Sequence, residues 1–83
     1  MELIDTIDLM TSDDYKARFR AEYWQTKIRY QKLHHILIQQ EAGTLGHELT
    51  CPVSLLEQQA HNMGVYLKTL EVRAEIEHIN LDA

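Results

Sequence analysis

Residues 13–42 read DDYKARFRAEYWQTKIRYQKLHHILIQQEA, a stretch without proline or glycine. Its largest apolar and aromatic side chains recur at alternating spacings of four and three residues, which is typical of one packed face of a helix. The row comprises Phe19, Tyr23, Thr26, Tyr30, Leu33 and Leu37. Ser12 is the expected N-cap, with two aspartates in the first turn, and Gly43 marks the expected end. We therefore predict a helix over about residues 13–42.

A second row of side chains lies roughly 120–150° around the axis of this helix from the first. It consists of Trp24, Ile28, His35 and Ile38. A helix that packs on one partner needs one row, so the two rows predict two neighbours.

A second helix is expected after the turn signals of residues 43–50, whose number suits a helix–helix connection. Thr50 or Cys51 is the expected cap, and Pro52 takes the first helical position, where its missing N–H costs nothing. The second helix is expected over about residues 52–78.

The second helix has its own rows of side chains. One alternates spacings of four and three residues and comprises Leu56, Ala60, Met63, Leu67, Leu70 and Ala74. A further row comprises Val65, Val72, Ile76 and Ile79. Two matched rows joined by a short connection predict an all-α fold, a long antiparallel helical hairpin.

The length of 83 residues predicts a single domain over residues 1–83, in which residues 1–11 form an N-terminal arm. We expect the arm to be a short helix or an extended segment that packs on a neighbour. Two helices cannot enclose a core, and Cys51, the one cysteine, cannot form a disulfide within the chain. Self-association into an oligomeric helical bundle, a dimer or a higher assembly, is therefore expected.

Composition favours the cytoplasm. One cysteine suits a reducing compartment, and the first ten residues carry acids where a signal peptide carries basic residues. No run of 18 apolar residues is present, so no interaction with a membrane is expected.

The charge is unevenly distributed, because the chain carries −5 overall while residues 15–35 hold six basic residues against one acid. Five of the six aromatic residues lie in the same stretch. Aromatic rings stack on bases and basic side chains hold phosphates, so this combination suits a nucleotide site. The alternative is that the aromatics fill the packed row while the basic side chains reach to water along its edge. The predicted ligand-binding residues are Lys16, Arg18, Arg20, Tyr23, Trp24, Lys27, Arg29, Tyr30, Tyr66 and Arg73.

Other chemistries have weaker support. The acidic remainder of the chain would repel duplex nucleic acid. His34 and His35 are adjacent and point about 100° apart, so they cannot bind one metal ion from a regular helix. Cys51 is expected to cap or pack rather than act as a nucleophile. We therefore expect no catalytic residues, no metal, no cofactor and no enzyme activity.

Two further features of the second helix have open interpretations. Glu71, Glu75 and Glu77 are expected to form a solvated face or to be partners of the basic first helix. Gly64 inside a helix indicates either tight helix packing or floor space for a ligand beside Tyr66.

Six stretches of the chain resemble short phage and prophage proteins of Gram-positive bacteria. They are DDYKARFRAEY (13–23), TKIRY (26–30), EAGTL (41–45), CP (51–52), MGVYL (63–67) and LEVRA (70–74). The likeness covers nearly the whole chain and implies a phage setting, but no active site. In size, helical hairpin and pocket chemistry the chain is also similar to small helical anti-defence sponge proteins, an analogy at the level of fold.

The leading hypothesis is a phage anti-defence protein in the cytoplasm of the infected bacterium. It would bind and sequester a nucleotide-derived immune second messenger, of the cyclic oligonucleotide or cyclic ADP-ribose type, without cleaving it. The alternative is an anti-CRISPR-like inhibitor or regulator that binds a host defence protein through the basic, aromatic face of the first helix.

Overall fold

The computed structural model describes residues 1–82, and these contain helices and no strand. In chain order they are the 3-10 helix η1 (Leu3–Thr6) and the α-helices α1 (Ile7–Met10), α2 (Tyr15–Ala42) and α3 (Val53–Glu77). The predicted all-helical fold is confirmed, and both long helices begin and end within two residues of the expected positions.

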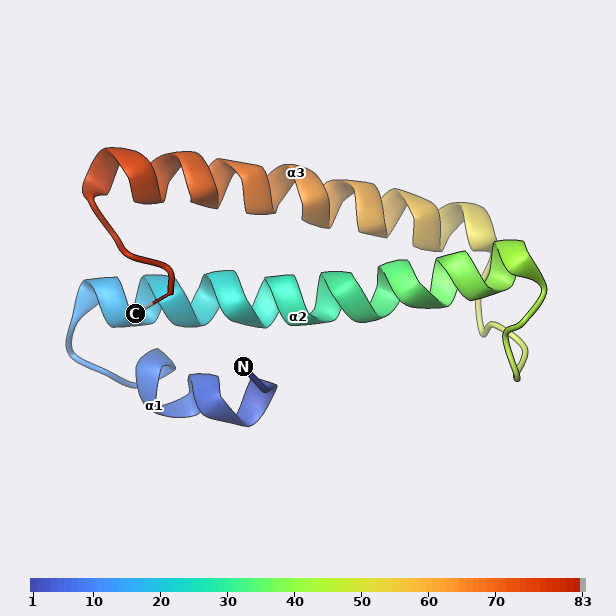
Figure 1. The fold of residues 1–83 in the computed structure, drawn as a ribbon, viewed down its shortest axis with the longest axis horizontal. Helices are drawn as coiled ribbons and strands as arrows, with labels where there is room; N and C mark the ends of the chain where they lie inside the picture. Colours follow the sequence, from blue (N-terminus) through green and yellow to red (C-terminus); the bar gives the residue numbers. More distant parts are fainter. Residues whose placement is uncertain (83) are drawn as a thin grey trace.

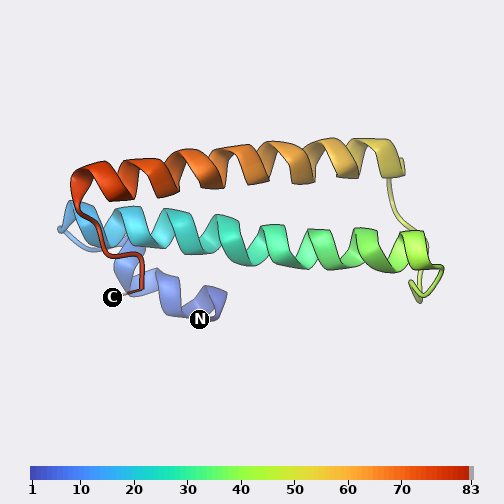
Figure 2. The same ribbon diagram turned by 45° about the horizontal axis from the view of Figure 1, so that its top comes forward.

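The two long helices lie side by side and run in opposite directions (Figure 1). The molecule is elongated, with extents of 43 × 25 × 18 Å. η1 and α1 pack along α2, on a side away from α3 (Figures 1 and 2). After α3 the chain turns back across the start of α2, and we call residues 79–82 the strap (Figure 1).

The N-cap residues of both long helices differ by one or two positions from the predicted ones. Asp14, not Ser12, is the N-cap of α2, because its carboxylate accepts a hydrogen bond from the Lys16 backbone N–H at 3.2 Å. Ser12 instead accepts from the Asp14 N–H through its hydroxyl at 3.1 Å. Pro52, not Thr50 or Cys51, is the N-cap of α3, because its ψ of 139° is still extended and the helix begins one residue later.

Both long helices end in a left-handed residue. Gly43 has φ 76°, and the N–H of Thr44 donates to the Gln39 carbonyl at 2.8 Å, so the last carbonyls of α2 are satisfied. His78 ends α3 at φ 57° without being a glycine, and the Ile79 N–H donates to the Ala74 carbonyl at 2.8 Å. This turn directs the strap back over α2.

The buried core lies at the end of the molecule where the strap crosses. Its members are Phe19, Tyr23, Leu67, Leu70, Ala74 and Ile79, with Trp24, Tyr30 and Leu81 packed against them. Toward the connection the same rows are less covered, and Leu33, Leu37 and Leu56 are only half-buried. The interface between α2 and α3 is therefore closed at one end and open at the other.

The N-terminal arm forms short helices, one of its two expected forms, and these pack on α2 of the same chain. Thr6 is 1% exposed, and its hydroxyl accepts from Gln25 Nε2 at 3.0 Å. Ile28 is buried, whereas Ile38, further along α2, is 49% exposed. The chain's own arm thus supplies one of the two neighbours along part of the helix.

Three of the four residues predicted for the further row of α3 are exposed and make up its outer row, whereas Ile79 lies beyond the end of the helix and is buried. Val65, Val72 and Ile76 are 54%, 50% and 71% exposed. Within the described residues, neither long helix has the length of apolar sequence that a membrane crossing requires.

Replacing Gly43 with alanine should lower the free energy of unfolding by about 1 kcal/mol, because a Cβ disfavours the left-handed conformation. Gly46→Ala is the matched control, since Gly46 has no left-handed φ and a Cβ there meets nothing within 4 Å. Chemical denaturation of both variants measures the difference. Equal stabilities would contradict the assigned role of Gly43.

Candidate functional site

Four of the predicted ligand-binding residues share one side of α2. Lys16, Arg20, Trp24 and Lys27 fall within a sector of about 80° at 100° per residue. The strap crosses this side, since the Trp24 Nε1–H donates to the Leu81 carbonyl at 2.7 Å and Lys16 Nζ donates to the His78 carbonyl at 3.4 Å. We call the four residues the strap-side face. Trp24 holds the strap in place, so its indole N–H is not available to a ligand.

Arg20 is the unpaired charge on the strap-side face. Its Nε is buried and has no hydrogen-bond partner within residues 1–82. Buried polar groups normally have partners, and a guanidinium binds carboxylates or phosphates with its fork of N–H groups. Lys27, half-buried on the same face, also makes no ion pair to a described residue. The face can therefore accept an anion.

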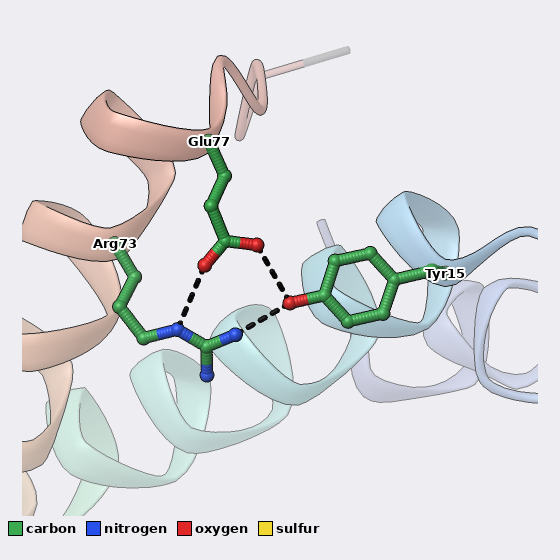
Figure 3. A network of polar contacts seen from close by, with 3 residues as sticks. All are labelled: Tyr15, Arg73 and Glu77. Atoms are coloured by element: carbon green, nitrogen blue, oxygen red, sulfur yellow. Dashed lines mark hydrogen bonds and ion pairs between the residues drawn. The ribbon is translucent and has the colours of Figure 1, made fainter.

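Tyr15 and Arg73 are held in a network with Glu77 (Figure 3). The Tyr15 hydroxyl donates to Glu77 at 2.7 Å, Arg73 Nε donates to Glu77 at 2.9 Å, and an Arg73 Nη donates to the Tyr15 hydroxyl. The guanidinium of Arg73 also lies 4.9 Å from the centre of the Phe19 ring. The hydrogen bonds from Tyr15 and then Arg73 lower the pKa of Glu77, and the bond to Glu77 raises the pKa of Tyr15. Arg73, a predicted ligand-binding residue, thus links α3 to α2 through Tyr15, which was not predicted.

Tyr23 and Tyr66 make similar bonds between the two helices. The Tyr23 hydroxyl donates to Glu71 at 2.7 Å, and the Tyr66 hydroxyl donates to Glu22. Burial, followed by the bond to Glu71, raises the pKa of Tyr23 to about 12. The expectation that acids of the second helix are partners of the first is met at Glu71 and Glu77, although their partners on α2 are tyrosines.

The remaining predicted arginines lie elsewhere. Arg18 and Arg29 are on roughly the opposite side of α2 from Arg20, at 100° per residue. The Arg18 guanidinium donates to the Ser12 carbonyl at 2.8 Å and so holds the start of the helix. Arg29 is exposed. One pocket in one copy of the chain cannot use all ten predicted residues.

A groove between α2 and α3 contains residues that the sequence analysis did not assign to a ligand. It has a volume of about 590 Å³, and its walls include Tyr30, His34, Glu57, His61 and Lys68. Of these residues only Tyr30 was predicted. The spacing of Glu57, His61, Gly64 and Lys68 places them on one side of α3, a signal that was present in the sequence.

Gly64 forms part of this groove and not a floor beside Tyr66. A Cβ at position 64 would lie 3.5 Å from Tyr30 Cε1 and 3.7 Å from its hydroxyl oxygen. The glycine therefore faces a ring of α2.

Comparison with protein families gives one match. The family model described as Sequestin matches residues 13–76, which is more than half of the chain. The chain belongs to the Sequestin family. No curated protein and no solved structure matches it.

The Sequestin region contains every predicted ligand-binding residue, from Lys16 to Arg73, and both walls of the groove. The arm, the strap and Glu77 lie outside it. In this Sequestin chain, the segments that close one end of the helix pair are thus outside the matched region.

Glu77→Gln should make the Sequestin chain less sensitive to acid. The lowered pKa of Glu77 means that its contribution to stability is complete above its unfolded value of 4.5 and is lost as the pH falls through the folded value. Denaturant titrations from pH 7 to about pH 3 should show a shallower loss of stability for this variant than for the wild type.

Glu75→Gln is the matched control, because Glu75 is exposed and makes no hydrogen bond to a described residue. It should keep the wild-type profile. Identical profiles for Glu77→Gln and the wild type would contradict the stabilising role of the network.

Proposed function

We propose that this chain binds and sequesters a nucleotide-derived second messenger of a bacterial immune system, without cleaving it, and serves a phage in this way. The family name supports sequestration of a ligand rather than catalysis. The resemblance of residues 13–74 to phage proteins supports the setting. Cyclic oligonucleotides and cyclic ADP-ribose are the proposed ligand types.

The observation that carries the proposal is the unpaired Arg20 on a basic, aromatic face. A buried guanidinium N–H without a partner has lost its water and has gained no hydrogen bond, which is unfavourable. A phosphate oxygen would satisfy it, and Lys27 on the same face adds a second positive charge. The phosphates of a nucleotide would therefore supply the hydrogen-bond acceptor that the strap-side face lacks.

We propose further that the working form is a homo-oligomer, a dimer or a higher assembly. The exposed Val65, Val72 and Ile76 follow spacings of seven and four residues, which suit packing against another helix. A neighbouring copy would cover this row. It would also bring a second set of basic residues near the first, so that Arg18 and Arg29 of one copy could contribute to a site with another.

Arg20→Gln should weaken binding of the messenger by about tenfold to a hundredfold, which corresponds to the loss of a hydrogen bond from a charged group. Lys32→Gln is the matched control, because it removes the same charge from an exposed position outside the strap-side face. Isothermal titration with cyclic dinucleotides, cyclic trinucleotides and cyclic ADP-ribose isomers measures both.

Ligand recovered after the complex is heated should have an unchanged mass, because sequestration leaves it intact. Cleaved ligand would contradict the proposal, as would the absence of binding to every member of the panel. Equal weakening by Arg20→Gln and Lys32→Gln would show that the strap-side face is not the site.

A further inference from the structure

The groove between α2 and α3 lies where the core is open, beyond the reach of the strap. Its volume of about 590 Å³ is within the range of about 300–1,000 Å³ that small-molecule sites occupy. A second hollow shares His34, Leu37 and Glu57 with it and continues toward the connection. The groove therefore offers room for a ligand without any movement of the buried core.

Tyr30 differs from the other tyrosines of the chain. The hydroxyls of Tyr15, Tyr23 and Tyr66 each donate to a glutamate on the partner helix. The Tyr30 hydroxyl makes no hydrogen bond to any residue of the described chain, although it lies in the groove. It is a polar group available to a ligand.

The ring of Tyr30 is held parallel to that of His34. The two planes differ by 13° and the ring centres are 5.8 Å apart. Flat side chains of this kind stack on nucleobases with little preference for sequence. Gly64 presents no side chain, and the edge of the Tyr30 ring lies in front of it, so a planar group in the groove would lie against the two rings and not between Tyr30 and α3.

The charges in the groove are arranged along α3. Lys68 and Glu57 are eleven residues apart, or about 16 Å at 1.5 Å per residue. A phosphate would be attracted to the Lys68 end and repelled from the Glu57 end. The hollow beside the strap has the opposite character, because Glu71, Glu75 and Asp82 line it. A phosphate is therefore better placed in the groove than in this acidic hollow, whose lining does not include Arg20 or Lys27.

We propose that the groove is a base-binding site, in which a planar heteroaromatic ring lies against the rings of Tyr30 and His34 while its phosphate is held by Lys68. The site deepens the proposed function and rests on it, because it names the part of the chain that recognises the base of the sequestered nucleotide. It adds His34, His61 and Lys68 to the residues that bind the ligand.

Gly64→Ala separates this proposal from a structural role for the glycine. The added methyl group would be in ordinary contact with Tyr30, and alanine favours a helix over glycine, so the melting temperature should rise by a few degrees. At the same time the methyl group would fill the space between α3 and the edge of the Tyr30 ring, so that the ring could not move toward α3 when a base binds. Cyclic di-AMP and cyclic GMP–AMP, titrated calorimetrically, should bind about tenfold more weakly than to the wild type.

Lys68→Gln should also weaken binding about tenfold and should reduce its dependence on salt, because an ionic contact is lost. Lys32→Gln, with the same change of charge outside the groove, should bind as the wild type does. Adenosine has the ring without the phosphate. Its affinity for Gly64→Ala should be lower than its affinity for the wild type, whereas its affinity for Lys68→Gln should equal that for the wild type.

The outcomes distinguish the two proposals. Wild-type affinity in both Gly64→Ala and Lys68→Gln, together with weakened binding in Arg20→Gln, would overturn the base-binding groove and leave the proposed function standing. Weakened binding in the two groove variants, with Gly64→Ala more stable to heat, would support the groove. If the wild-type protein binds none of the nucleotides, the groove and the proposed function both fail.

Discussion

The structure depends on one constraint: two long helices cannot hide all the apolar surface that they carry. At one end the chain meets this constraint itself, because the strap buries Ile79 against α2 and α3 and the arm buries Thr6 against α2. At the other end it does not. Leu37 and Leu56 remain half-buried there. The outer row of α3 also faces water, as far as Ile76 beside the strap. The closed end holds the fold together, and the open groove and the outer row are surfaces that other molecules can cover.

The tyrosine–glutamate bonds connect this packing to function. Three of them join α2 to α3, and because each needs a hydroxyl opposite a carboxylate, together they favour one register between the helices. That register places Gly64 opposite Tyr30 and forms the groove. A tyrosine used in this way is a poor candidate for stacking on a ligand. The residues left available include Arg20, Lys27, Arg29 and Tyr30 from the predicted set, and His61 and Lys68 from α3.

The helices were predictable from the sequence because periodicity and caps are local: the row from Phe19 to Leu37 and Gly43 set the bounds of α2. The strap was not, because Ile79 continues a helical row and His78 adopts φ 57° without the glycine that usually marks such a turn. The strap-side face could be predicted, because a helix turns by about 100° per residue and this rotation places the four residues of the face on one side of α2. The roles of Tyr15 and Arg73 could not be predicted, since they depend on the register between two helices, which is a long-range property. Lys68 was missed for the same reason, because its place in the groove also depends on the register between α2 and α3.

The most direct test of this account is the mass of the protein in solution, measured by light scattering at micromolar concentrations. The account predicts a multiple of the 9.7 kDa chain. A Val72→Glu, Ile76→Glu variant should shift to the monomer because two charges would enter the shared surface, and Gln59→Glu, outside the row, should not. A wild-type chain that is fully folded and monomeric would contradict the claim that its uncovered apolar row is an interface between copies.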